Sequence, residues 1–272
     1  MTTNNAYGAI CAELLNRIRT QHPLIHHITN FVVMNDTANA TLALGALPVM
    51  AHAIEEVAEM VGAAGALVLN PGTLTREWVD SMLIAGKRAN ELNVPIIYDP
   101  VGVGATKLRN DTAKQLLGGL KLAAIRGNSG EVGSLAGMGG VVKGVESVEG
   151  VSDPVQATKN VAARYQTAVT ITGKRDILSD GKRVLGVDNG HPLLTTITGS
   201  GCMSTTAVAI FCAVEKDYLV ASAAALACYG LAAQNAARVS TGPGSFRSAL
   251  LDALYMLTPE QVAAEAQIVE LA

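Results

Sequence analysis

The 272-residue sequence predicts a single α/β domain over residues 1–272, a three-layer α/β/α sandwich with a mostly parallel central sheet and an antiparallel edge. Short apolar runs alternate with longer helical patterns, which favours parallel strands joined by right-handed crossovers. Two turn signals late in the chain indicate the antiparallel edge. Apolar residues make up 49% of the chain and charged residues only 16%, so a large buried core is expected and disorder is not.

The expected parallel strands are continuous apolar runs such as LVLN, PIIYD and VTIT. Strands that are buried on both faces have this pattern, because neither face can carry polar side chains. Helical patterns lie between the runs, for example over 74–92 and 153–166. The six expected strands span residues 24–29, 48–51, 66–70, 95–99, 123–126 and 168–172.

The segment 177–194, ILSDGKRVLGVDNGHPLL, breaks the alternation. Asp180-Gly181 separates its first two runs and Asn189-Gly190 sets off a third, and both pairs are typical of hairpin turns because Gly and Asn tolerate positive φ. We therefore expect antiparallel strands added to the edge of the parallel sheet. From Cys202 to the end of the chain, the pattern is helical throughout.

Charge and cysteine usage narrow the class of protein. The net charge is −3 with scattered basic residues, so neither nucleic acid nor an anionic membrane is the expected partner. The N-terminus has no basic region followed by an apolar run, and the apolar stretch 218–233 is Ala-rich and is interpreted as a buried helix. The four cysteines show no C-x-x-C spacing, which favours a reduced, cytoplasmic protein.

Polar and glycine residues follow several of the expected strands. In an open parallel sheet, ligands bind at the carboxyl ends of the strands, although Gly and Asn at such ends can also simply turn the chain. Five such ends, including a carboxylate and an arginine, favour a ligand site. They are Thr29-Asn30, Asn70-Pro71-Gly72-Thr73, Asp99-Pro100-Val101-Gly102, Arg126-Gly127-Asn128 and Thr172-Gly173.

Two carboxylates at these ends are candidate magnesium ligands. Asp99 ends an apolar strand, where it is either a turn residue or a ligand for Mg²⁺, which prefers carboxylate and water oxygens. In the string RGNSGE, Asn128 and Glu131 have the spacing of a capping box, and Glu131 can cap a helix and also hold metal-bound water. Arg126 in the same string can meet phosphate oxygens with its planar fork.

The loop Thr198-Gly199-Ser200-Gly201-Cys202 is followed by a helical pattern. A small glycine loop that opens a helix directs several backbone N–H groups toward one point, where the helix dipole favours negative charge. Gly199 and Gly201 allow a phosphoryl group to approach the backbone closely. Cys202 is expected in the first turn of the helix, where the thiolate is favoured. An ordinary loop with a buried thiol is the alternative.

Other nucleotide and hydrolase motifs are absent from the sequence. There is no G-x-x-x-x-G-K-[ST], and Gly102 and Gly104 lack the third glycine of the dinucleotide fingerprint. A P-loop enzyme and a Rossmann-type oxidoreductase are therefore disfavoured. Neither H-E-x-x-H nor G-x-S-x-G occurs, which excludes the corresponding proteases and hydrolases.

The ordered strings HHITNFVVMNDTANATLALGALPVMA, LVLNPGTL, IIYDPVGVGAT, AAIRGNSGE, TITG, TGSGC and GPGSF resemble the hydroxyethylthiazole kinases, within the ribokinase-like superfamily. The resemblance covers about residues 24–250. It departs from the family pattern at Pro71 and Ser200, and residues 138–152 match the pattern only loosely. It implies transfer of the γ-phosphoryl group of ATP, with Mg²⁺, to the primary hydroxyl of 4-methyl-5-(2-hydroxyethyl)thiazole in thiamine salvage. It also implies a homotrimer with active sites at subunit interfaces.

The resemblance assigns a role to each candidate residue. It implies that Cys202, Gly199 and Gly201 serve catalysis, with Cys202 positioning or deprotonating the alcohol. It implies thiazole binding by Asn30, Val32, Met50 and Gly199, nucleotide phosphates near Arg126 and Thr172, and metal binding by Asp99 and Glu131. Asn70, Gly72 and Thr73 are also expected to bind ATP, because they follow a strand at the same edge of the sheet.

Two other functions remain open on the same fold. A sibling kinase of hydroxymethylpyrimidine would share most of these motifs, and only the thiazole-side residues argue against it. A non-catalytic nucleotide-binding regulator could lose the proton acceptor and the metal carboxylates, for which this chain retains candidates.

Overall fold

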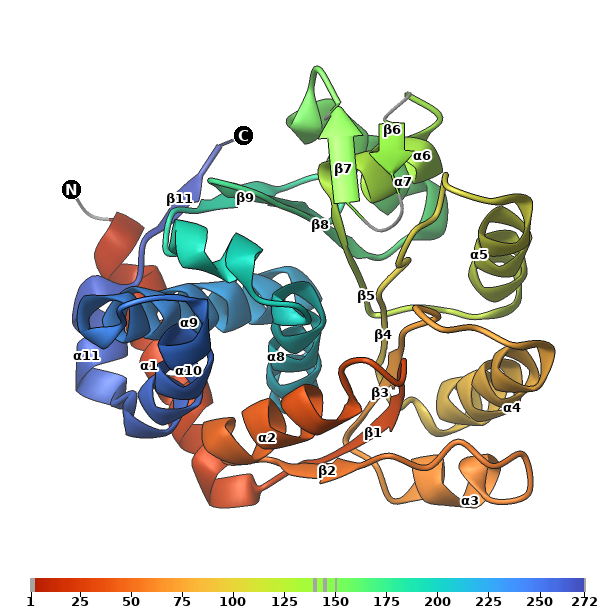
Figure 1. Cartoon of the computed structure of the whole chain (residues 1–272), viewed down its shortest axis with the longest axis horizontal. Coiled ribbons are helices and arrows are strands. Elements are labelled where there is room, and N and C mark those ends of the chain that lie inside the picture. Colours follow the sequence, from red (N-terminus) through yellow and green to blue (C-terminus); the bar gives the residue numbers. More distant parts are fainter. Residues whose placement is uncertain (1–2, 139–140, 144–145, 150, 272) are drawn as a thin grey trace.

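The computed structural model describes residues 3–138, 141–143, 146–149 and 151–271. A nine-stranded sheet runs through it in the order β11-β10-β9-β8-β5-β4-β3-β1-β2. Layers of helices cover both faces of the sheet (Figure 1). The expected three-layer α/β/α architecture is confirmed.

The parallel part of the sheet contains the six strands that the apolar runs predict. Neighbouring strands pair in parallel from β2 to β8, for example with Ile25 opposite Ala66 and Leu67 opposite Ile96. The boundaries agree to within a few residues. These strands are β1 (Leu24–Ile28), β2 (Leu47–Val49), β3 (Ala66–Leu69), β4 (Ile96–Tyr98), β5 (Ala124–Asn128) and β8 (Ala168–Thr172).

The antiparallel edge is confirmed, but its third strand is not the expected one. Strands β9 (Asp176–Ser179) and β10 (Val184–Val187) form a hairpin whose turn contains Gly181 at φ 92°. The run after Asn189-Gly190 is instead a 3-10 helix, η1 (Pro192–Thr196), since a proline at its start favours a helical turn. The third antiparallel strand is β11 (Ile268–Glu270), which corrects the prediction that the chain is helical to its end.

The helices form two groups, one on each face of the sheet (Figure 1). One face carries α1 (Thr3–Gln21), α2 (Met34–Leu44), α8 (Ser200–Val214), α9 (Tyr218–Val239), α10 (Pro243–Met256) and α11 (Pro259–Glu265). The other carries α3 (Val57–Gly62), α4 (Arg76–Leu92), α5 (Lys107–Gly119), α6 (Ser129–Ala136) and α7 (Pro154–Tyr165). A separate two-stranded sheet, β6 (Val141–Lys143) and β7 (Glu146–Glu149), joins α6 to α7.

Alternation along the strands separates the core into two clusters. In β3, Ala66 and Val68 pack with the α1, α8 and α9 side, whereas Leu67 and Leu69 pack with the α4 side. Helix α9 is long and apolar enough to cross a membrane, but 83% of its most apolar window is buried in the fold. It is therefore the buried core helix that the Ala-rich composition predicts.

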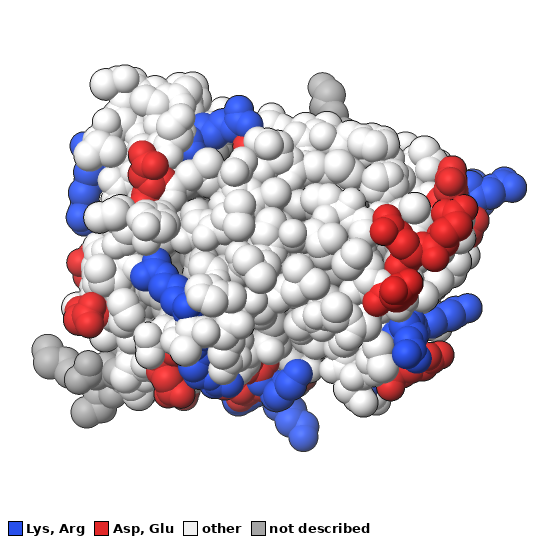
Figure 2. Space-filling model, turned by 90° about the horizontal axis from the view of Figure 1, so that it is seen from below, with Lys and Arg blue, Asp and Glu red and all other residues white. Residues whose placement is uncertain are grey.

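One surface of the molecule is poor in charge. Figure 2 shows the side that lies below β1, β2 and α2 in Figure 1, and its charged side chains lie toward the margins around a broad uncharged area. These elements and the turn after β1 expose apolar side chains, namely Phe31, Val32, Leu42 and Leu47.

Candidate active site

The polar side chains predicted at the strand ends gather at one edge of the sheet. Strands β1, β3, β4, β5 and β8 are parallel neighbours, so their carboxyl ends share this edge. Hydrogen bonds and close contacts link their polar residues to the N-terminus of α8. We call this group the strand-end site, and its members are Asn30, Asn70, Asp99, Arg126, Thr172 and Cys202.

A line of hydrogen bonds connects three of the strand ends. Asn30 Nδ2 donates to Asn70 Oδ1 at 2.9 Å, and Asn70 Nδ2 donates to Asp99 Oδ2 at 3.1 Å. Asn70 Nδ2 also lies 3.1 Å from the Sγ of Cys202, and Asn30 Nδ2 lies 3.8 Å from the same sulfur. The two asparagines therefore fix the carboxylate and the thiol relative to each other, and all three strand-end side chains are buried.

Thr205 belongs to this arrangement although the sequence analysis did not select it. Its hydroxyl donates to Asp99 Oδ2 at 2.8 Å. Cys202 and Thr205 are three residues apart on α8, and this spacing places two side chains on one face of a helix. That spacing is the signal in the sequence that could have identified Thr205.

Glu131 forms the predicted capping box with Asn128. Asn128 Oδ1 accepts from the N–H of Glu131 at 2.9 Å, and Glu131 Oε2 accepts from the N–H of Asn128 at 2.8 Å. The second carboxylate oxygen, Oε1, accepts from the N–H of Gly102 at 2.9 Å. Glu131 therefore ties the start of α6 to the loop that follows β4.

Both candidate metal carboxylates are destabilised as anions. Burial raises the pKa of Glu131 to about 7, and the nearby charge of Asp99 adds to the effect. Burial also raises the pKa of Asp99, while Arg126 and the hydroxyl of Thr205 oppose the shift. A bound cation would stabilise two buried carboxylates that repel each other, and a ligand such as a nucleotide could bring that cation to the site. Among the described residues, no group of three His, Cys, Asp or Glu side chains could hold a metal without such a ligand.

Cys202 lies in the first turn of α8 as expected, but it is not a favoured thiolate. Burial and the charge of Asp99 raise the pKa of its thiol to about 12, and they outweigh the lowering by Asn70 and Arg126. The expectation that the helix N-terminus increases the thiolate fraction is therefore wrong. Desolvation beside a carboxylate exceeds the effect of the helix dipole here.

The glycine loop and Arg126 provide a positive region suited to an anion. Gly199 adopts φ +86° as the N-cap of α8, and among the described residues it supplies no side chain to cap the first turn of this helix. The guanidinium of Arg126 lies against that turn, since a Cβ on Gly201 would be 2.7 Å from its Nη1. Arg126 Nη2 donates to Thr172 Oγ1 at 2.5 Å, and its buried Nε has no partner in the described part of the chain.

The predicted thiazole residues lie at the other end of the site, around the turn after β1. Asn30 Oδ1 accepts a hydrogen bond from the N–H of Val32 at 3.1 Å, and Val32 itself is 61% exposed. Phe31 contacts the ring of Trp78 with centroids 4.9 Å apart, and His52 stacks on Trp78 at 4.1 Å. Met50 is half-buried and follows the neighbouring strand β2. Within the described residues, no hydrogen bond joins it to this turn.

Three residues predicted to contact ATP lie nearer to this turn than to Arg126. Asn70 holds Asn30 and Cys202, as described above. The Oγ1 of Thr73 accepts from the N–H of Phe31 at 3.1 Å, and a Cβ on Gly72 would be 2.6 Å from Asn30 Nδ2. The loop after β3 therefore packs on the turn after β1, whereas Arg126 and Thr172 lie on the far side of β4.

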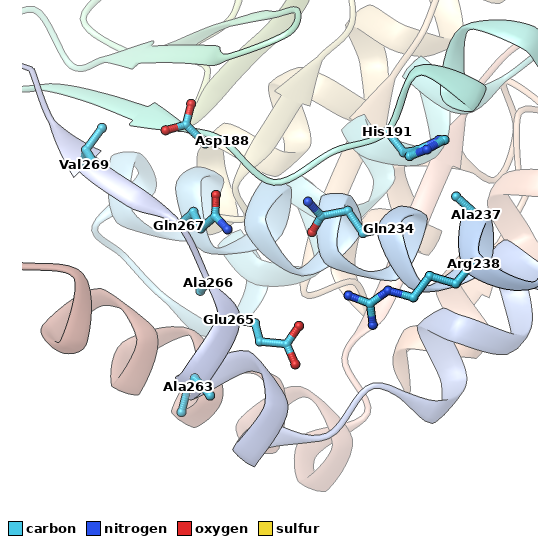
Figure 3. A pocket seen from close by; sticks show the side chains of 11 residues that line it. Asp188, His191, Gln234, Ala237, Arg238, Ala263, Glu265, Ala266, Gln267 and Val269 are labelled. Carbon is cyan, nitrogen blue, oxygen red and sulfur yellow. The ribbon is translucent and has the colours of Figure 1, made fainter.

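A separate polar hollow lies between α9, α11 and β11 (Figure 3). Its volume is about 910 Å³, and its lining includes Asp188, His191, Gln234, Arg238 and Glu265. None of the residues predicted from the sequence lines it. The strand-end site is therefore the better candidate for the chemistry.

Comparison with known proteins identifies the family to which the chain belongs. The family model described as the hydroxyethylthiazole kinase family matches residues 15–260. A hydroxyethylthiazole kinase of Desulforudis audaxviator is 65% identical over 257 residues, which are 94% of each chain. The structure of the hydroxyethylthiazole kinase protein from Pyrococcus horikoshii superposes with a TM-score of 0.89 at 43% identity, covering 97% of this chain and 99% of that one.

More distant structures share the fold alone. A ribokinase-like superfamily protein from Enterococcus faecalis superposes with a TM-score of 0.64 at 13% identity, over 89% of this chain and 93% of that one. The fold is therefore ribokinase-like, as the ordered motifs imply.

Proposed function

Since the chain belongs to the hydroxyethylthiazole kinase family, we propose that its strand-end site transfers the γ-phosphoryl group of ATP to the primary hydroxyl of 4-methyl-5-(2-hydroxyethyl)thiazole. The alcohol oxygen bonds to the γ-phosphorus as the bond from that phosphorus to the β-phosphate bridging oxygen breaks, which gives the phosphate monoester and ADP, in thiamine salvage. The hydroxyl proton leaves to the transferred phosphoryl group or to water. The observation that carries this proposal is the meeting of Asn70, Asp99 and Cys202 beside Arg126 and the glycine N-cap of α8. A thiol that can orient an alcohol thus lies beside a positive region that can hold a phosphoryl group, and phosphoryl transfer depends on such positioning and charge stabilisation.

Arg126 and the first turn of α8 would hold the charge of the moving phosphoryl group. The guanidinium offers fixed donors, and the free N–H groups of Gly201 and its neighbours point out of the helix start. Both are in place before substrate binds, so little reorganisation accompanies the transfer. Thr172, which already accepts from Arg126, would orient that guanidinium beside the nucleotide phosphates.

Asp99 and Glu131 would hold Mg²⁺ together with ATP, either directly or through water. Their residue types fit this ion, because Mg²⁺ usually takes one or two carboxylates and completes its shell with water and phosphate oxygens. When bound, the ion would neutralise phosphate charge. Binding of a dication would also favour the ionised form of both carboxylates, whose pKa values burial raises.

Cys202 would orient the alcohol rather than remove its proton as a free thiolate. With a pKa raised to about 12, the thiol is almost entirely protonated near pH 7. Asn70 fixes the sulfur from one side, and a hydrogen bond from the thiol lowers the pKa of Asp99 on the other. The sulfur is thereby held in one place, where it can accept a hydrogen bond from the substrate hydroxyl.

We also propose that three copies assemble and complete the thiazole side of the site. Phe31 and Val32 are 60% and 61% exposed, so a ring bound at this turn stays open to water unless another copy covers it. The uncharged area of Figure 2 and the exposed Leu42 and Leu47 lie on the same elements and suit burial between copies. The number three rests on the resemblance to the family.

One continuous sheet from residue 24 to residue 270 supports a single catalytic domain. The four cysteines are free thiols, and three of them are buried. This pattern supports a cytoplasmic location, where ATP is available and thiols stay reduced.

The proposal is tested by measuring ADP release from Mg-ATP with purified protein and a panel of vitamin-precursor alcohols. We expect the hydroxyethylthiazole to be turned over fastest. Faster turnover of hydroxymethylpyrimidine under the same conditions would establish the sibling activity instead. Nucleotide binding without ADP release for any alcohol would favour the regulator.

A further inference from the structure

Arg109 occupies a helix position that is unfavourable for a cation unless other contacts of its side chain compensate. It is in the first turn of α5, where the helix dipole disfavours positive charge. Its backbone N–H is capped by Thr106, and its side chain leaves the helix toward the strand-end edge of the sheet.

The guanidinium of Arg109 joins two loops through their backbone carbonyl oxygens. Its Nη1 donates to the carbonyl of Pro71 at 3.1 Å and to that of Val101 at 2.7 Å, and its Nη2 donates to the carbonyl of Gly72 at 2.7 Å. The first and third carbonyls belong to the loop after β3, and the second belongs to the loop after β4. Hydrogen bonds with a charged donor are stronger than neutral ones, and the planar fork can make several at once.

Each of the two loops also holds a member of the site. The N–H of Gly72 donates to Asn70 Oδ1 at 3.1 Å, and the N–H of Gly102 donates to Glu131 Oε1 at 2.9 Å. Gly102 has φ +72°, and a Cβ there would be 3.0 Å from Arg109 Cδ, so the loop lies directly on the arginine. Arg109 therefore contacts the backbone that places Asn70 and Glu131 without contacting either side chain.

We infer that Arg109 is a positioning residue, which clamps the loops after β3 and β4 so that Asn70 and Glu131 keep the geometry needed for transfer. The inference rests on the proposed function for its effect on activity, but the clamp itself can be measured without substrate. Arg126 and Thr172 lie on strands that the clamp does not touch, so the nucleotide side should be unaffected when Mg²⁺ is absent.

The test compares Arg109→Met and Arg109→Lys with Lys107→Met, which removes a cation from the same helix turn but lies at an exposed ion pair with Asp111. Removing a group that orients metal-site residues typically lowers metal affinity or activity by about 10- to 100-fold. We expect Arg109→Met to lose turnover in this range, with a severalfold rise in half-saturating Mg²⁺. Arg109→Lys should be intermediate, because an ammonium cannot reach all the carbonyls together.

Amide hydrogen exchange supplies the readout that is independent of activity. In both Arg109 variants, the amides of Gly72 and Gly102 should exchange faster, whereas those of β8 should not change. Wild-type exchange at these two amides, or an unchanged Mg²⁺ dependence in Arg109→Met with an active wild type, would overturn the inference. If wild type and Lys107→Met both fail to phosphorylate the thiazole alcohol, the proposed function fails while exchange still decides the role of Arg109.

Discussion

Replacing Cys202 separates two roles for its sulfur, because the loss of a base and the loss of a positioning group lower turnover by different factors. Cys202→Ala removes the sulfur and leaves the amide of Asn70 bonded to Asp99 at 3.1 Å. Cys202→Ser keeps a polar hydrogen at the same place but replaces the thiol by a hydroxyl that does not ionise near neutral pH. Cys212→Ala is the matched control, since it removes a buried thiol from the same helix.

The raised pKa of the Cys202 thiol sets the loss of turnover that we expect in Cys202→Ala. With a thiol pKa of about 12, only about one molecule in 10⁵ carries the thiolate at pH 7. A single positioning hydrogen bond contributes about 0.5–1.5 kcal/mol, which corresponds to roughly a 2- to 13-fold loss in Cys202→Ala. General-base help would instead be worth about 10²- to 10⁴-fold. We expect the smaller loss in Cys202→Ala and nearly wild-type turnover in Cys202→Ser.

The assay is kcat against pH from about 7 to 9.5 for the four proteins, with saturating Mg-ATP and thiazole alcohol. A positioning thiol predicts a wild-type profile without the tenfold rise per pH unit that a thiolate base would give below its pKa. An equal loss of several hundredfold in Cys202→Ala and Cys202→Ser, together with such a rise in wild type, would refute the positioning role.

Three further predictions concern charge, assembly and the glycine loop. The pKa of Glu131 is raised to about 7 by burial, so the folded chain holds a proton that the unfolded chain loses above about pH 4.5. Without nucleotide and metal, the free energy of unfolding of wild type relative to Glu131→Gln should therefore fall by up to about 3 kcal/mol as pH rises from about 4.5 to 7, and level off above. Urea titrations across this range measure it, and a difference independent of pH would contradict the burial effect. Leu47→Glu places a charge on the exposed edge strand β2 and should shift light scattering to the monomer and raise KM for the thiazole alcohol, whereas a fully active monomeric wild type would exclude the shared site. Gly201→Ala puts a Cβ 2.7 Å from Arg126 Nη1 and should displace the guanidinium. The loss of one hydrogen bond to a charged ligand, about 1.5–3 kcal/mol, should raise KM for ATP roughly 10- to 150-fold, and an unchanged KM would place the phosphates elsewhere.

Burial explains which elements the sequence predicts well. Strands β3, β4 and β8 are buried on both faces, and their continuous apolar runs therefore mark them within a few residues. Strand β11 has only three residues, of which only Ile268 is fully buried, so no alternation or run distinguishes it from the end of a helical pattern. Its pairing with β10 is decided by tertiary contact rather than by local sequence.

The sequence likewise predicts some features of the candidate site and not others. Parallel strands bring their ends to one edge, so the grouping of Asn30, Asn70 and Asp99 follows from the strand prediction alone. The protonation of Cys202 does not, because it depends on burial and on the charge of a residue distant in the sequence. Arg109 acts on backbone carbonyls, which any residue type supplies, and no sequence pattern therefore identifies its partners.

The most direct test of phosphoryl transfer at the strand-end site is phosphorus NMR of the products formed from Mg-ATP and the thiazole alcohol by wild type and by Arg126→Met. We predict one new phosphate monoester and an equal amount of ADP from wild type, and strongly reduced formation of both from Arg126→Met, since the variant lacks the guanidinium beside the first turn of α8. Undiminished monoester from Arg126→Met would place the transfer outside this site. Release of inorganic phosphate without any monoester from wild type would contradict the alcohol as acceptor.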